Sequence, residues 1–179
     1  MLRDLGVVAL VLYFLWRAGE SPRALGWTRH QIGREIALGG LLFVPVYIAG
    51  RWLEAQLLGL GLSGPLTPAP NLVPPHDSAS VLLAVLLVAV VAISEETIFR
   101  GYLLLRFRAI VPNAGLALVL AFVIFALGHG YEGMAGVVSV GAVGAAFGAV
   151  YLWRRSLVAP ATMHFLLDLV AIVLLPLLA

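Results

Sequence analysis

The stretch VVAISEETIFRGYLLLRFR (residues 90–108) decides how this chain folds, because it places charged side chains inside an otherwise apolar helix. Glu95, Glu96 and Arg100 follow a long aliphatic run and precede another one. An ionisable side chain in the hydrocarbon core of a bilayer is costly, so it usually faces the interior of a helical bundle and has a function. The stretch therefore predicts a membrane helix whose polar side chains turn towards a shared cavity.

The composition of the whole chain agrees with this interpretation. Of its 179 residues, 62% are hydrophobic and 11% are charged, whereas a soluble domain has about 45–50% and about 25%. This balance excludes a disordered chain, a nucleic-acid-binding surface and an ordinary cytosolic enzyme. The chain contains no cysteine, which excludes disulfides, a thiolate nucleophile and cysteine-ligated metal sites. We expect an integral membrane protein that has the lipid bilayer, and no nucleic acid, as a partner.

Hydropathy predicts an all-α fold, namely a polytopic transmembrane bundle of about six spanning helices. The expected helices cover residues 2–16, 36–60, 80–108, 114–131, 134–152 and 156–178. They are expected to form a single membrane domain over residues 1–179, with a motif-bearing catalytic core at about 80–179.

The distribution of arginine predicts the orientation of these helices. Basic residues cluster in three alternate connections, as Arg17, Arg23, Arg29 and Arg34, then Arg106 and Arg108, then Arg154 and Arg155. The positive-inside rule places all three connections on the cytoplasmic side. The proline-rich segment 61–79 then lies outside. Four tryptophans near the expected interfaces are interpreted as an aromatic belt: Trp16, Trp27, Trp52 and Trp153.

Three further polar side chains lie at membrane depth on other helices, namely His129, His164 and Asp168. At a rise of about 1.5 Å per residue, Glu95 lies roughly 16 Å along its helix from Arg106. The same rise places His164 roughly 13 Å from Arg155. Groups from three helices therefore converge near the middle of the membrane, where they need a shared polar cavity.

The spacing of these groups suggests their chemistry. Glu96 and Arg100 are one helical turn apart and can neutralise each other. His164 and Asp168 have the same spacing, so Asp168 can orient the imidazole or stabilise its charge. Glu95 lies about 100° around the helix from Glu96 and has no cation nearby in sequence, which suits a general base. A glutamate with two histidines can activate water, and the histidines can position that water, bind an oxyanion or hold a metal. This set fits hydrolysis of an amide.

Each of these groups also has a simpler interpretation. Glu96 and Arg100 alone could be a structural ion pair, and His164 with Asp168 alone could be a packing contact between helices. Glu95 could belong to the proton relay of a proton-coupled carrier, although no inverted repeat supports that function. The chain could also be a non-catalytic membrane immunity or scaffold protein. The conjunction of all these groups on three helices favours hydrolysis.

Three short motifs resemble those of the CPBP family, which comprises CAAX prenyl endopeptidases and bacterial bacteriocin-processing or self-immunity proteases. The segment from Glu95 to Arg100 is similar to its EExxxR motif. Phe125 and His129 are similar to its FxxxH motif, and His164 with Asp168 to its HxxxN/D motif. Upstream, Leu25-Gly26-Trp27 resembles a weak Leu-Gly pattern of bacterial members.

The resemblance implies an all-helical intramembrane endopeptidase that acts on a peptide or a membrane-anchored protein. It implies that Glu95 activates water, with support from Glu96 and Arg100. By the same resemblance, His129 and His164 are expected to stabilise the oxyanion or to position the water, and Asp168 to complete the site.

The family is described both as metalloproteases and as metal-independent glutamate proteases. We favour the metal-independent form, with no cofactor; in the alternative, Glu95, His129 and His164 would bind zinc. Eukaryotic CAAX enzymes typically carry Asn where this chain has Asp168, which weakens the transfer of a prenylated substrate. The absence of lysine suggests a bacterial origin, and hence the bacterial inner membrane as the location.

Overall fold

The computed structural model describes residues 2–29, 31–65 and 77–178, and these residues form an all-α fold. Most of the proline-rich segment lies outside the described residues. The elements in chain order are α1 (Leu2–Arg17), the 3₁₀ turn η1 (Pro22–Leu25), α2 (Ile32–Gly59), α3 (Ser78–Glu95), the π-helix η2 (Glu96–Leu103), α4 (Leu104–Ile110), α5 (Ala114–Leu127), the 3₁₀ turn η3 (Gly130–Glu132), α6 (Gly133–Arg154), α7 (Val158–Asp168), the π-helix η4 (Leu169–Leu174) and α8 (Leu175–Leu178).

These elements form the six helical segments expected from hydropathy, and the predicted fold class is confirmed. The third segment is a continuous helix through α3, η2 and α4, and the last runs through α7, η4 and α8. Four segments are long and apolar enough to cross a membrane: Ile32–Gly59, Ser78–Ile110, Gly130–Arg154 and Val158–Leu178. The other two are shorter, since α1 has 16 residues and α5 has 14.

Local side-chain chemistry sets the ends of the site-bearing helices. Asp77 and Ser80 form a capping box at the start of α3. Asn113 caps α5 by accepting hydrogen bonds from two backbone amides of its first turn. Val111 is extended because it precedes Pro112, and this ends the long third helix. The helix that carries Glu95 therefore ends at Ile110, and the helix that carries Phe125 begins at Ala114, after a short turn.

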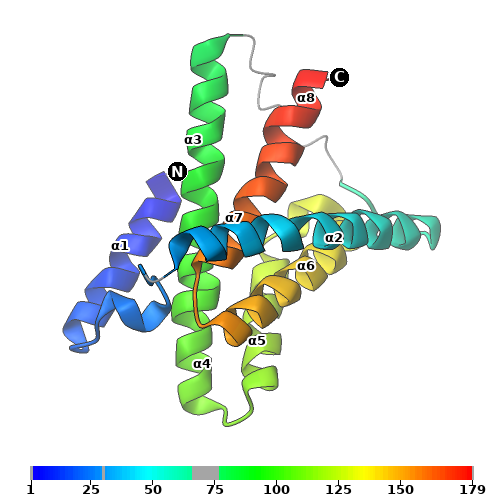
Figure 1. Ribbon diagram of the computed structural model, residues 1–179. Helices are drawn as coiled ribbons and strands as arrows, with labels where there is room; N and C mark the ends of the chain where they lie inside the picture. Colours follow the sequence, from blue (N-terminus) through cyan, green and yellow to red (C-terminus); the bar gives the residue numbers. More distant parts are fainter. Residues whose placement is uncertain (1, 30, 66–76, 179) are drawn as a thin grey trace.

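The helix α2 lies across the other helices rather than alongside them (Figure 1). Its close approaches to α7 and α6 include two glycines. A Cβ atom on Gly39 would lie 2.6 Å from the carbonyl oxygen of Ala159, and one on Gly50 would lie 2.8 Å from the side chain of Val143. Ser139 also donates a hydrogen bond to the Gly50 carbonyl (2.9 Å). Small residues therefore allow the close approach that membrane helices use in place of a hydrophobic driving force.

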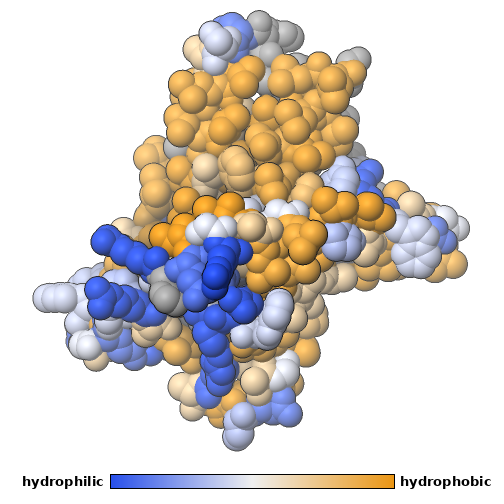
Figure 2. Space-filling model, viewed as in Figure 1, coloured by the Kyte–Doolittle hydropathy of each residue, from blue (hydrophilic) through white to orange (hydrophobic). Residues whose placement is uncertain are grey.

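Much of the face seen in Figure 2 is apolar. Large aliphatic side chains are exposed along the helices, for example Leu41 (72%), Leu83 (65%) and Ile110 (78%). A soluble domain rarely exposes apolar patches of such extent, whereas a bilayer solvates them. Together with the four long apolar helices, this surface identifies an integral membrane protein.

The orientation inferred from arginine remains a prediction, and the cysteine-free chain makes it simple to test. Single cysteines at Arg29, Arg108 and Arg155 should react with a membrane-impermeant maleimide from the cytoplasmic side. A cysteine at Asn71, which lies outside the described residues, should react from the opposite side. The cysteine-free parent is the control. A split among the first three positions would contradict the arrangement of alternate connections.

Candidate active site

Three of the six predicted site residues lie on the third helical segment, where its geometry changes. Glu95 is the last residue of α3, and Glu96 and Arg100 belong to the π-helix η2. A π-helix is rare and frequently occurs at functional sites, because it shifts side chains away from regular α-helical register. A second π-helix, η4, begins immediately after Asp168 on the last segment. Two of the three motif-bearing helices thus depart from α geometry next to an acidic side chain.

Glu96 is the centre of the hydrogen-bond network. Its Oε1 atom accepts a bond from Arg100 (2.8 Å) and lies 2.8 Å from Nδ1 of His164. The side chains of Glu96 and Arg100 are 0% and 3% exposed. A carboxylate this deeply buried needs charged partners, since an unpaired one would carry a large desolvation penalty. The sequence prediction of a Glu96–Arg100 pair is confirmed, and the bond to His164 extends it to a second helix.

Arg100 contacts two further helices besides its ion pair with Glu96. Its guanidinium donates a hydrogen bond to the carbonyl of Gly144 on α6 (3.1 Å). Its Cζ atom also lies 4.3 Å from the centre of the Phe125 ring, which is a cation–π distance. The cation therefore connects η2 with α5 and α6 as well as neutralising Glu96.

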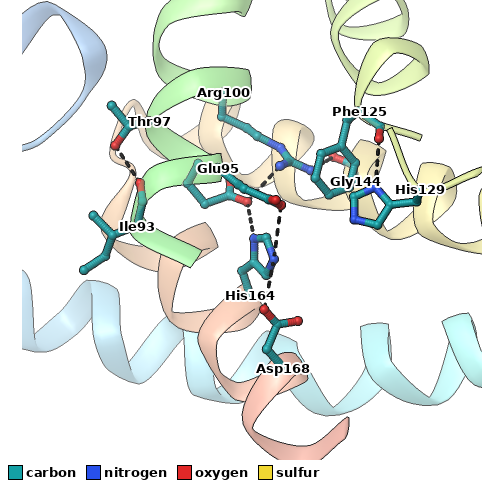
Figure 3. Close-up of polar contacts among 10 residues, drawn as sticks. Ile93, Glu95, Thr97, Arg100, Phe125, His129, Gly144, His164 and Asp168 are labelled. Carbon is teal, nitrogen blue, oxygen red and sulfur yellow. Dashed lines mark hydrogen bonds and ion pairs between the residues drawn. The ribbon is translucent and has the colours of Figure 1, made fainter. Parts of the chain in front are cut away.

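The other ring nitrogen of His164 faces two carboxylates (Figure 3). Its Nε2 atom lies 3.8 Å from Oε2 of Glu95 and 3.5 Å from Oδ2 of Asp168. Glu95 and Asp168 are 14% and 15% exposed, so this side of the imidazole is the more open one. Within the described part of the chain, the buried Oε2 atom of Glu95 has no hydrogen-bond partner. The structure thus places an unsatisfied carboxylate oxygen beside an oriented histidine.

His129 lies at the edge of this cluster, after the last turn of α5. Its Nδ1 atom is 2.9 Å from the Phe125 carbonyl, so Nδ1–H donates and only Nε2 is left for another partner. The Phe125 ring lies 4.6 Å from the His129 ring and 6.3 Å from the His164 ring. Among the described residues, no hydrogen bond or ion pair joins His129 to the other five predicted residues. The Phe125 ring therefore lies near both histidine rings and is the contact that they share.

Sequence reasoning missed a second support for this cluster. Trp27 donates an indole hydrogen bond to the hydroxyl of Thr97 (3.0 Å), and that hydroxyl donates to the Ile93 carbonyl (2.6 Å). Thr97 is the residue after Glu96, so Trp27 anchors the segment before α2 to the helix that carries the carboxylates. Trp27 is half-buried, whereas Trp16, Trp52 and Trp153 are each more than 60% exposed, and the assignment of all four to an aromatic belt stays a prediction. The motif spacing alone contained no signal for this long-range bond.

The expected alternative of a zinc site can be compared with the observed donor groups. Nδ1 of His164 contacts Glu96 and Nδ1 of His129 contacts the Phe125 carbonyl, so each ring keeps Nε2 as the nitrogen that could bind a metal. In residues 2–29, 31–65 and 77–178, no group of three or more His, Cys, Asp or Glu side chains is arranged to hold a metal ion. The set of Glu95, His129 and His164 therefore does not fit a three-ligand site in this conformation, and we derive no step through a metal.

Comparison with known proteins gives the family. A model of the type II CAAX prenyl endopeptidase Rce1-like family matches residues 77–170, a range that includes all six site residues. No curated protein and no solved structure matches the chain. The matched range is more than half of the chain, so the chain belongs to the type II CAAX prenyl endopeptidase Rce1-like family, and this membership implies CAAX-type intramembrane protease activity.

Proposed function

We propose that this protein is an intramembrane endopeptidase in which Glu95 activates a water molecule to hydrolyse a peptide bond. The observation that carries the proposal is the difference between the two adjacent glutamates. The Glu96 side chain is 0% exposed, and its Oε1 atom is bonded to Arg100 and His164, whereas the Glu95 side chain is 14% exposed and forms no hydrogen bond among the described residues. A general base needs a free lone pair within reach of water. Each of the two glutamates has one oxygen without a partner among the described residues, but of the two only the Glu95 side chain is partly exposed.

The geometry beside Glu95 supports a specific division of roles. A water molecule near Oε2 of Glu95 and Nε2 of His164 would transfer a proton to the carboxylate, and its oxygen would attack the peptide carbonyl carbon. Two carboxylates beside Nε2 favour a proton on that nitrogen, so His164 can donate to the oxyanion. His129 would supply a second donor through Nε2. Glu95 would then return the proton to the departing amine as the C–N bond breaks.

The remaining residues of the cluster act as positioning residues in this proposal. Glu96 fixes the orientation of the His164 ring through Nδ1, and Arg100 is the ion-pair partner of Glu96. Asp168 supports the proton on Nε2 from the side opposite Glu95. Such preorganised dipoles and charges reduce the reorganisation needed as the transition state forms.

The proposed substrate is a peptide or a membrane-anchored protein segment, and the proposed location is the bacterial inner membrane. The test is to incubate the purified protein in lipid nanodiscs with a panel of peptides, and to identify products by mass spectrometry. The panel pairs each C-terminal CAAX peptide in prenylated and unprenylated forms with a transmembrane peptide. We expect a single defined cleavage in at least one class. The absence of cleavage across all classes would contradict the proposal.

We also propose that hydrolysis needs no metal. Peptide cleavage should then persist after exhaustive chelation, with the metal content of the same sample determined by mass spectrometry. The reason is that Glu95, His164 and His129 can act on water directly, as described above. Stoichiometric zinc, with activity that disappears on chelation and returns on adding zinc, would overturn this prediction.

A further inference from the structure

A polar cavity lies away from the catalytic cluster, between η1, α4 and the end of α6. Its volume is about 240 Å³, and arginines from all three elements line it: Arg23, Arg108 and Arg155. Tyr151 also lines it and is 7% exposed. None of the six site residues lines this cavity. Its lining therefore combines three cations with a hydroxyl-bearing ring.

These three arginines lack the carboxylate partners that the neighbouring Arg106 and Arg154 have in the described structure. The glutamates of this face are already paired, since Glu20 binds Arg106 (2.5 Å) and Glu35 binds Arg154 (2.7 Å). Within the described residues, no carboxylate forms an ion pair with Arg23, Arg108 or Arg155. The three predicted cytoplasmic connections carry eight arginines against these two glutamates. A pocket with several unneutralised guanidinium groups selects an anion, and planar guanidinium groups match phosphate oxygens in particular.

The backbone segments around the cavity are closely packed. Arg155 adopts a left-handed conformation (φ 55°) where α6 ends, a position usually taken by glycine. A Cβ atom on Gly26 would lie 2.8 Å from the Tyr151 ring, so the end of η1 packs closely against Tyr151. The Leu157 amide also donates to the Gly26 carbonyl (3.0 Å). An arginine at a position that favours glycine suggests that its side chain is needed there.

The position of the cavity indicates which anion it binds. Strongly hydrophilic residues gather beside a broad apolar surface (Figure 2). Leu104 and Leu105 contribute an apolar wall to the cavity itself. Basic pockets between membrane helices on the cytoplasmic side are suited to anionic lipid headgroups. The volume is also below the roughly 300–1,000 Å³ of pockets that enclose a drug-sized ligand, which argues against a nucleotide.

We infer that Arg23, Arg108 and Arg155 form a binding site for the phosphate of an anionic phospholipid headgroup. The acyl chains of this lipid would lie on the adjoining apolar surface. The site connects η1, the helix that carries Glu96 and the turn that leads into α7 with His164. A bound headgroup would therefore hold together three segments on which the catalytic cluster depends.

Native mass spectrometry of delipidated protein in detergent tests this inference. Phosphatidylglycerol is titrated against phosphatidylcholine with identical acyl chains, and inorganic phosphate is tested as a competitor. We expect one phosphatidylglycerol to bind with clear preference. Arg23→Gln and Arg108→Gln should each weaken its affinity by roughly tenfold, as expected for the loss of a charge-assisted hydrogen bond. Arg155→Gly should do the same without loss of thermal stability, because glycine suits the left-handed conformation.

Arg29→Gln is the matched control, since Arg29 is an exposed arginine of the same face that does not line the cavity. This variant should retain the affinity of the parent protein. An equal loss of affinity in Arg29→Gln would mean diffuse attraction and would overturn the site. Equal affinity for the two lipids would overturn it as well. Displacement of the lipid by equimolar inorganic phosphate would assign the cavity to free phosphate and contradict the lipid proposal.

Discussion

Glu95→Gln should lower the rate of peptide hydrolysis by on the order of 10²–10⁴-fold while the protein remains folded. The amide is close in size to the carboxylate but cannot accept a proton from water. Folding should be unaffected, because Oε2 of Glu95 makes no hydrogen bond within the described structure. The measurement is the initial rate of cleavage of a peptide that the parent protein hydrolyses, together with the thermal unfolding curve of each variant in the same detergent.

Two further glutamates make this experiment decisive. Glu54→Gln removes a charge from a residue that pairs with Arg51 on the surface of α2, so the rate should stay near that of the parent. Glu96→Gln leaves Arg100 without a buried counter-charge, so this variant should lose thermal stability. Near-normal turnover in Glu95→Gln, with a folded but inactive Glu96→Gln protein, would mean that the roles of the two carboxylates are reversed.

Arg100→Ala should destabilise the protein by about 3–5 kcal/mol, which is the typical cost of breaking a buried ion pair by removing one partner. Glu96 would keep only His164 as a partner at a fully enclosed position. The substitution also removes the hydrogen bond to Gly144 and the contact with the Phe125 ring. Thermal unfolding in detergent provides the comparison with the parent protein.

A surface pair provides the control for this second prediction. Arg51 is 64% exposed and lies 2.6 Å from Glu54, so Arg51→Ala should cost at most about 1 kcal/mol. The double variant Glu96→Gln/Arg100→Ala should recover part of the stability lost in Arg100→Ala, because it removes the unpaired buried charge. If the double variant recovers none, the loss comes from packing and not from the ion pair.

Much of the fold could be predicted from hydropathy and from local helix signals. Six apolar segments gave six helical segments, since the length of a bilayer-spanning helix and the ends set by Pro112 and Asn113 are local properties. The i,i+4 spacing also predicted the Glu96–Arg100 pair, because residues one turn apart on a helix are neighbours in any tertiary structure. The crossing of α2 over α6 and α7 was not predictable, since it depends on close contacts at Gly39 and Gly50 with distant residues.

Within the site, the sequence by itself determined which chemical groups are present and that they lie at similar depth on three helices. Only the tertiary structure decided which partner each group has. His164 lies 68 positions after Glu96, and their 2.8 Å contact comes from the packing of α7 against the third segment. That contact engages Oε1 of the fully buried Glu96, whereas Glu95 is partly exposed and forms no hydrogen bond among the described residues, so packing distinguishes two adjacent glutamates that look alike in sequence. The physical reason is that side-chain spacing within one helix is local, whereas contacts between helices depend on the packing of the whole bundle.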